Sequence, residues 1–94
     1  MFHVLTTTYL QPLDVIEQTR PAHLEWLGGE VANGRILVAG RVESQTGAVL
    51  FTGDISTEEA DRLITADPYH QAGVVRYERV SFTGTFRAPA LSDS

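Results

Sequence analysis

Arg20 and His23 are the first candidates for chemistry in this chain of 94 residues. Spacings of three and four residues place them on one helical stripe with Ile16, Leu27 and Val31, which should face the core. A helix normally turns its polar side chains to the opposite side, so two polar residues on the inner stripe need an explanation. His23 can serve there as a general base, because a neutral imidazole accepts a proton near neutral pH. The alternative is a partly buried histidine that is bonded to a backbone carbonyl.

Asp67 is the candidate partner of His23. It follows a second predicted helix, directly before Pro68, in a segment that the predicted fold returns to one end of its sheet. A carboxylate that fixes the tautomer and the orientation of a histidine is the usual way to make a general base. The alternative is a turn initiator, since Asp before Pro is common at turns. Tyr69 and His70 stand beside Asp67 and can reach the same pocket, although a lone histidine there is more often a solvated turn residue.

Other residue types add no second reactive centre. His3 is interpreted as a strand-end side chain, and the three scattered histidines lack the spacing of metal ligands, so we expect no metal site. No serine lies in a nucleophile-elbow pattern. The chain has no cysteine and no lysine, which excludes disulfides, thiolate nucleophiles and Schiff-base chemistry.

Pro21 divides the helical segment that carries His23. Because proline has no N–H to donate to the residue four positions back, the sequence predicts a short helical turn over 12–18 and a main helix that begins at Pro21. Asn33-Gly34 predicts the C-terminal cap of this helix. His23 then lies in the first turn, where the positive end of the helix dipole disfavours the imidazolium and leaves a neutral base.

The remaining elements follow from strand and cap signals. Ser56 and Glu59 predict a capping box that opens a second helix, which ends before Asp67. A slip in the apolar phase of the last strand predicts a bulge there. The predicted strands cover 2–9, 35–40, 48–53 and 74–86, and a predicted turn covers 69–73. The order is β-α-β-β-α-β, which predicts an α+β, ferredoxin-like fold with a four-stranded antiparallel sheet and two main helices on one face.

The second face of this sheet should alternate toward polar residues, because both helices cover the first face. The runs 36–39 and 49–51 are apolar throughout instead. An exposed apolar patch of that size usually marks an interface. We therefore predict a homodimer that packs sheet to sheet; the alternative is that short strands alternate poorly for no functional reason.

Composition excludes several classes of protein. One domain is expected over 1–86, followed by a frayed C-terminal tail at 87–94. The net charge of −5 and the scattered arginines argue against nucleic-acid binding, which needs a clustered basic face. The amino terminus lacks the pattern of a signal peptide, and no apolar stretch approaches the roughly 20 residues of a membrane span. We expect a cytoplasmic protein that binds no membrane.

Three segments taken together resemble the YCII-related (YciI-like) family. They are Arg20-Pro21-Ala22-His23-Leu24-Glu25-Trp26-Leu27, Gly34-Arg35-Ile36-Leu37-Val38-Ala39-Gly40 and Ala66-Asp67-Pro68-Tyr69. The resemblance runs from about residue 2 to residue 82, and the R-P-x-H-L-x-[YW]-L segment followed by D-P-[FY] is its most specific part. It implies a dimeric α+β barrel of ferredoxin-like subunits and an active-site dyad at His23 and Asp67. The chain differs from the commoner pattern at Arg41, which stands where proline is often found.

The resemblance also implies a type of reaction. A related domain is similar to muconolactone isomerase and to dehydrochlorinases of aromatic breakdown products. The implied activity is proton transfer by His23 on a small ring- or carbonyl-containing metabolite, without a cofactor. Asp67 would orient His23. Arg20 would bind a carboxylate or enolate oxygen of the substrate, and Tyr69 would line the pocket.

Two other classes of function remain open at this point. One is a non-catalytic dimeric module that binds a small molecule or a larger partner, with His23 as a hydrogen-bonding anchor. The other is purely structural dimerisation, which leaves Arg20 and His23 on the apolar stripe unexplained.

Overall fold

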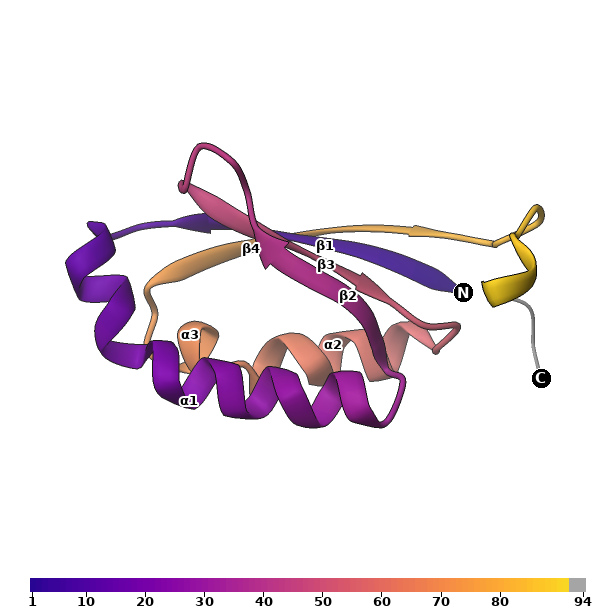
Figure 1. Cartoon of the computed structure of the whole chain (residues 1–94), viewed down its shortest axis with the longest axis horizontal. Coiled ribbons are helices and arrows are strands. Elements are labelled where there is room, and N and C mark those ends of the chain that lie inside the picture. Colours follow the sequence, from indigo (N-terminus) through magenta and orange to yellow (C-terminus); the bar gives the residue numbers. More distant parts are fainter. Residues whose placement is uncertain (92–94) are drawn as a thin grey trace.

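A four-stranded antiparallel sheet, in the order β2-β3-β1-β4, carries the helices on one of its two faces (Figure 1). The computed structural model describes residues 1–91. Its elements in chain order are β1 (Phe2–Tyr9), α1 (Leu13–Ala32), β2 (Ile36–Arg41), β3 (Gly47–Thr52), α2 (Thr57–Ala66), α3 (Pro68–Gln71), β4 (Val75–Phe82) and the 3-10 helix η1 (Pro89–Leu91). The predicted α+β, ferredoxin-like βαββαβ fold is confirmed, with α3 as a short additional helix.

The helix that carries His23 is continuous. The predicted break near Pro21, and the helix start there, are wrong, because α1 runs from Leu13 to Ala32 with the proline inside it. Proline removes one backbone hydrogen bond and usually bends a helix, and Figure 1 shows the axis of α1 changing direction in its first half. Ile16 and His23, one on each side of Pro21, are buried and anchor both parts of the helix in the core. His23 therefore lies in mid-helix, and the predicted influence of a helix N-terminus on its imidazole is wrong.

The predicted helix caps are confirmed. Asn33 ends α1, and Gly34 follows it with a φ of 82°, in the left-handed region that favours glycine. Ser56 Oγ accepts a hydrogen bond from the N–H of Glu59 at 3.1 Å, and the Glu59 carboxylate accepts from the N–H of Ser56 at 3.2 Å, which completes the capping box of α2. The segment predicted as a turn begins with α3 instead, since a proline opens this short helix. None of the helices within residues 1–91 combines the length and the apolar character needed to cross a bilayer.

Strand β4 pairs with β1 without interruption, from Phe82 opposite Phe2 to Val75 opposite Tyr9, so the predicted bulge in the last strand is wrong. The alternation of apolar residues along β4 changes for another reason. Val75 is buried on the helix side, whereas Val80 and Phe82 are exposed on the other side. β4 also ends at Phe82, four residues before its predicted end at 86. Within the described ladders a register shift occurs near the start of β2, and β2 and β3 differ from their predicted ranges by one residue at each end.

The two faces of the sheet are both apolar, but only one is covered. On the helix side the main core cluster consists of Leu5, Ile36, Leu50 and Leu63. The other face, here called the open sheet face, presents Val38, Val49, Phe51, Val80 and Phe82, all of them exposed or half-buried. The rings of Phe2, Phe51 and Phe82 stack there with centroids 5.8, 5.9 and 6.4 Å apart. The failure of strand alternation noted in the sequence therefore corresponds to an apolar surface in the folded chain.

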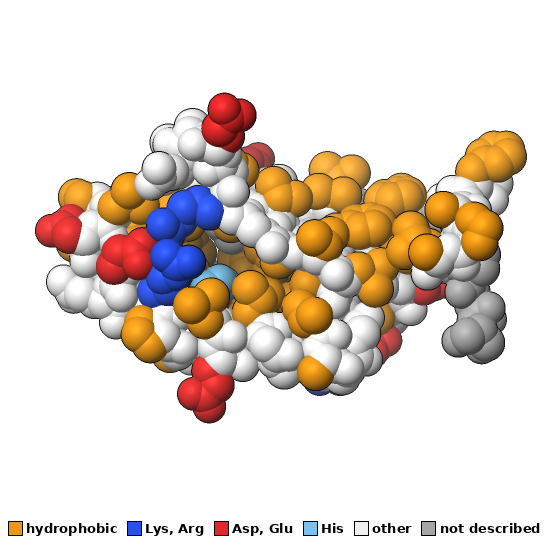
Figure 2. Space-filling model, in the orientation of Figure 1, with side chains coloured by type: hydrophobic (Ala, Val, Ile, Leu, Met, Phe, Trp, Pro, Cys, Tyr) orange, Lys and Arg blue, Asp and Glu red, His pale blue; other side chains and the backbone are white. Residues whose placement is uncertain are grey.

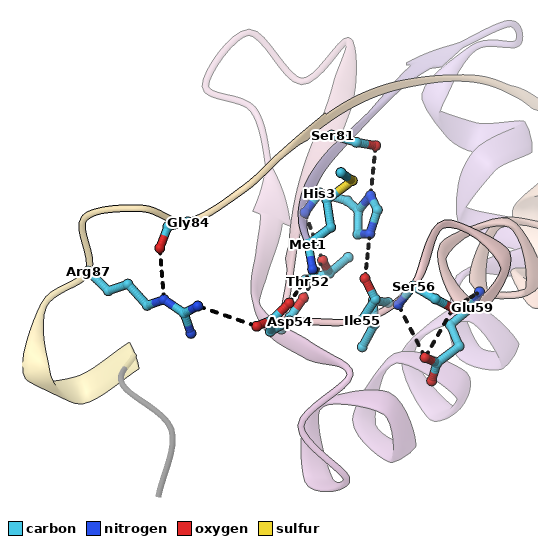
Figure 3. A network of polar contacts seen from close by, with 11 residues as sticks. Met1, His3, Thr52, Asp54, Ile55, Ser56, Glu59, Ser81, Gly84 and Arg87 are labelled. Carbon is cyan, nitrogen blue, oxygen red and sulfur yellow. Dashed lines mark hydrogen bonds and ion pairs between the residues drawn. The ribbon is translucent and has the colours of Figure 1, made fainter.

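His3 lies on β1, as predicted, but it is fully buried rather than at a free strand end (Figure 3). Its Nδ1 lies 2.7 Å from Ser81 Oγ, and its Nε2 lies 3.0 Å from the carbonyl oxygen of Ile55. Both ring nitrogens are therefore bonded, and the side chain joins β4 to the loop that precedes α2.

The C-terminal segment is partly ordered by polar contacts (Figure 3). Arg87 Nε donates to the carbonyl oxygen of Gly84 at 2.8 Å, and Arg87 Nη2 lies 3.5 Å from Asp54 Oδ2. Within the predicted tail, residues 89–91 form the 3-10 helix η1. The rest of the predicted tail, 92–94, lies outside the described residues.

Candidate active site

His23 and Asp67 are in direct contact, although 44 positions separate them in the chain. His23 Nδ1 lies 2.8 Å from Asp67 Oδ1. Asp67 has no exposed surface, and His23 is 8% exposed. α1 supplies the histidine from its middle, and the aspartate is the residue at which α2 ends and α3 begins. The predicted pair is therefore a buried contact between two helical elements.

Asp67 accepts two further hydrogen bonds. Its Oδ1 accepts from the backbone N–H of Tyr69 at 2.9 Å, which caps α3, and its Oδ2 accepts from the Tyr77 hydroxyl at 2.5 Å. One side chain thus combines both interpretations of the sequence, the partner of a histidine and the initiator of a turn. Burial raises the pKa of Tyr77, and the negative charge of Asp67 raises it further, so the hydroxyl keeps its proton and remains a donor. Three donors stabilise a carboxylate that would be costly to bury alone.

These bonds decide which nitrogen of His23 carries the proton. An ionised carboxylate only accepts hydrogen bonds, so Nδ1 is protonated and donates to Asp67. Nε2 is then the basic nitrogen of a neutral imidazole. Because His23 lines a pocket, Nε2 is the atom of this side chain that can take a proton from a ligand.

Two aromatic side chains hold the imidazole from its sides. Tyr69 stacks on His23 with ring centroids 4.0 Å apart and an angle of 15° between the planes, and Trp26 lies at 5.7 Å. Tyr69 lines the pocket, as predicted, but its closest ring contact is with the imidazole. Burial raises the pKa of Tyr69, which keeps this phenol neutral. The stacking restricts the orientation of His23 and supports the bond to Asp67.

The pocket beside His23 has a volume of about 180 Å³. Figure 2 shows it as a hollow with histidine at its floor and arginine side chains along one rim. Aliphatic side chains from α1, β2 and β3 make up much of its wall. The lining residues are Tyr9, Arg20, His23, Leu24, Leu27, Ala39, Gly40, Arg41, Ala48, Leu50 and Tyr69. Such a wall suits a small ring with a few polar substituents.

Arg20 lines the pocket but lies at its rim. Its side chain is 43% exposed, and Arg20 Nη1 lies 3.4 Å from Glu17 Oε2. The predicted inner stripe is correct for Ile16 and His23, whereas Val31 is exposed. Arg20 is therefore near His23 without being buried against the sheet.

Two polar residues of the pocket were not predicted to line it: Tyr9, and Arg41, which the sequence marked only as a departure from the family pattern. Arg41 Nε donates to the Tyr9 hydroxyl at 2.9 Å, and its guanidinium carbon lies 5.5 Å from the centroid of the tyrosine ring. Each is the last residue of its strand, β1 or β2. Both strands pair antiparallel with β3, so they run in the same direction and end at the same edge of the sheet. A ferredoxin-like strand order could have indicated this, because it brings the ends of these two strands to the same end of the sheet.

The other histidines lie outside this site. His70 is exposed and contacts the ring of Tyr77 edge-on, with centroids 6.1 Å apart. His3 is at the opposite end of β1 from Tyr9. Within residues 1–91, no three side chains among His, Cys, Asp and Glu gather as metal ligands would.

Comparison with known proteins gives both a fold and a family. The 5-chloro-2-hydroxyhydroquinone dehydrochlorinase TftG from Burkholderia phenoliruptrix, solved in complex with 2,5-dihydroxybenzoquinone, aligns with a TM-score of 0.73 at 22% identity over 88% of this chain and 94% of its own. A protein of Mycolicibacterium smegmatis known as "12 kDa protein" is 79% identical over 24 residues, which are 26% of this chain and all of that sequence. The YCII-related domain matches residues 1–83. The chain therefore belongs to the YCII-related family.

Proposed function

We propose that this chain is a cofactor-independent enzyme that transfers protons on a small ring- or carbonyl-containing molecule, with His23 as general base and Asp67 as the residue that orients it. One observation carries the proposal: a histidine in the wall of a pocket is bonded through Nδ1 to a fully buried carboxylate. An imidazole held in this way has one nitrogen available for catalysis, and the carboxylate behind it stabilises the protonated ring.

The proposed reaction begins when Nε2 of His23 takes a proton from a carbon or hydroxyl of the ligand. The electron pair left behind moves into a carbonyl group or ring. Return of the proton to another atom is an isomerisation, and departure of chloride with the electron pair is a dehydrochlorination; neither needs an oxidant. The Tyr69 N–H and the Tyr77 hydroxyl continue to donate to the Asp67 carboxylate throughout.

Arg20 and Tyr69 complete the proposed site. Arg20 is placed at the rim to bind a ligand oxygen that becomes negative, and Tyr69 supports the imidazole and borders the ligand. The fold shared with the dehydrochlorinase TftG, which binds the single-ring 2,5-dihydroxybenzoquinone, supports a ligand of this class. The pocket volume of about 180 Å³ also supports a small ligand, because it is below the roughly 300–1,000 Å³ of pockets that hold drug-sized ligands.

A homodimer through the open sheet face belongs to the same proposal. Val80 is 65% exposed on this face and Val38 is 61% exposed, beside the stacked phenylalanines. Size-exclusion chromatography with light scattering should give a dimer at micromolar concentration, and Val80→Asp should give a monomer. Val31→Asp, at an exposed valine of α1, is the matched control and should remain a dimer. A monomeric wild-type protein would refute the proposed assembly.

The rigidity of His23 also favours a second candidate, a module that binds a small molecule without turning it over. An imidazole stacked on Tyr69 and bonded to Asp67 has the fixed orientation that suits a hydrogen-bonding anchor. The two candidates differ only in turnover.

The test compares wild type with His23→Ala and Asp67→Asn on lactones, chlorinated hydroxyquinols and 2-oxo acids. Wild type should turn over at least one class, and His23→Ala should lower kcat by about 10²- to 10⁴-fold, the usual contribution of general acid–base catalysis. His70→Ala removes an exposed histidine outside the pocket and should leave kcat unchanged. Saturable binding without turnover would favour the module. Full activity of His23→Ala would refute both roles of the dyad.

A further inference from the structure

The rim of the pocket carries a cluster of three charged side chains, Glu17, Arg20 and Arg41, here called the rim cluster. Glu17 Oε1 lies 2.7 Å from Arg41 Nη2, and Glu17 Oε2 lies 3.4 Å from Arg20 Nη1. One carboxylate thus presents a separate oxygen to each of two arginines. Both arginines line the pocket, whereas Glu17 does not.

Within the rim cluster, Arg41 has more contacts that hold it in place than Glu17 has. Arg41 is 24% exposed and also contacts the Tyr9 hydroxyl and ring, so Glu17 is not the only group that holds it. Glu17 is 41% exposed, and the two arginines hold its pKa below the ordinary value, Arg41 more strongly through its hydrogen bond. Exposed ion pairs of this kind contribute little to stability, so a ligand can replace Glu17 at low cost.

We propose that Arg20 and Arg41 form a carboxylate clamp, and that Glu17 occupies it until an anionic ligand replaces Glu17. The clamp rests on the proposed function and deepens it, because it names the substrate class as a single-ring compound with a carboxylate group. The carboxylate lies between the guanidinium groups, and the ring extends past the aliphatic wall toward His23. Arginine suits this task, because its planar fork matches a carboxylate.

Once Glu17 has left the clamp, the charges that remain at the site favour an anion. The clamp contributes two positive charges and Glu17 one negative charge. Asp67 behind His23 adds a further negative charge. A neutral ligand leaves the Glu17 pairs intact, whereas a carboxylate takes over both arginines and releases Glu17 to solvent. The structure therefore predicts that binding strength follows the charge of the ligand.

Calorimetric titration with two probes of nearly equal shape tests the clamp. The probes are 4-hydroxybenzoate, an anion, and 4-hydroxybenzamide, which is neutral. Wild type should bind the anion about tenfold or more tightly, since hydrogen bonds between charged groups are the strong ones. Arg41→Gln should remove this preference. Glu17→Gln should strengthen binding of the anion several-fold and leave binding of the amide unchanged, because the competing carboxylate is gone.

Arg35→Gln is the matched control. Arg35 makes a similar pair with Glu30, at 2.6 Å, and does not line this pocket, so the variant changes the net charge equally without touching the clamp. It should keep the preference for the anion. Equal affinity of wild type for both probes, no binding of 4-hydroxybenzoate at millimolar concentration, or an equal loss in Arg35→Gln would each overturn the clamp.

The same titration on His23→Ala separates the clamp from the proposed function. The variant should retain the preference for the anion, because the rim cluster is intact. Retained preference together with an absence of turnover in wild type would refute the catalytic proposal alone. Turnover of carboxylate substrates that is unaffected by Arg41→Gln would refute the clamp alone.

Discussion

Tyr77→Phe tests how much the hydrogen bond from the Tyr77 hydroxyl stabilises the buried carboxylate of Asp67. The substitution removes the hydroxyl that donates to Asp67 Oδ2 at 2.5 Å and keeps the ring. Hydrogen bonds to charged groups contribute about 1.5–3 kcal/mol, and Asp67 has no exposed surface on which bulk water can replace the donor. We therefore expect the free energy of unfolding to fall by about 1.5–3 kcal/mol near neutral pH.

The pH dependence of this loss is a second, independent check. Burial and the charge of Asp67 raise the pKa of Tyr77 above its ordinary value of 10.0. Above that pH the unfolded chain releases the proton and the folded chain keeps it, so the folded state binds more protons and stability falls as pH rises. The advantage of wild type over Tyr77→Phe is therefore fully present below pH 10, and it should shrink by about 1.4 kcal/mol by pH 11.

Urea unfolding, followed by the fluorescence of Trp26 at equal protein concentrations, measures both quantities. Asp67→Asn and the double variant complete a double-mutant cycle that isolates the pair. The reasoning fails if Tyr77→Phe costs less than about 0.5 kcal/mol near neutral pH, the range of an ordinary surface substitution. It also fails if the difference between the two proteins stays constant from pH 8 to pH 11.

Three further substitutions test other parts of the fold by urea unfolding followed by far-UV circular dichroism, which does not depend on Trp26. Trp26→Phe should change stability by less than about 1 kcal/mol, because Trp26 Nε1 is buried without a hydrogen-bond partner among residues 1–91 and its removal offsets the lost packing; a loss of several kcal/mol would contradict this. His3→Leu should cost about 1–3 kcal/mol, since it leaves the Ile55 carbonyl without its partner, while ligand binding stays unchanged. Ser56→Ala should cost about 1 kcal/mol through loss of the α2 cap, and Ser56→Thr should restore most of it.

Local signals in the sequence predicted much of the fold because they act within a few residues. The range of β1 and the caps of α1 and α2 agree with the structure. Pro21 was the main error, because its local preference to start a helix was overridden by burial of Ile16 and His23 on either side of it. The change in apolar phase along β4 is present in the structure, but its predicted cause, a bulge, is wrong. The apolar residues change from one face of the strand to the other while the register with β1 is kept.

Only those residues of the candidate site that lie in a recognisable sequence motif could be predicted. The sequence and the family resemblance pointed to His23 and Asp67, whose contact is present in the structure. The stacking of Tyr69 and the hydroxyl of Tyr77 depend on how α3 packs against α1 and β4, which no local pattern encodes. Arg41 could be assigned to the pocket only from the strand order, because that order determines which residues lie near the end of β2.

The donors around Asp67 come from three different elements: the His23 ring from α1, the Tyr69 N–H from α3 and the Tyr77 hydroxyl from β4. They are oriented when the chain folds, before any ligand arrives. In the proposed reaction, a proton that reaches His23 therefore meets an electric field that is already in place, and little reorganisation energy has to be supplied at that moment, in contrast to a carboxylate surrounded by water. A loosened contact between these elements should slow proton transfer even where every residue of the pocket is unchanged.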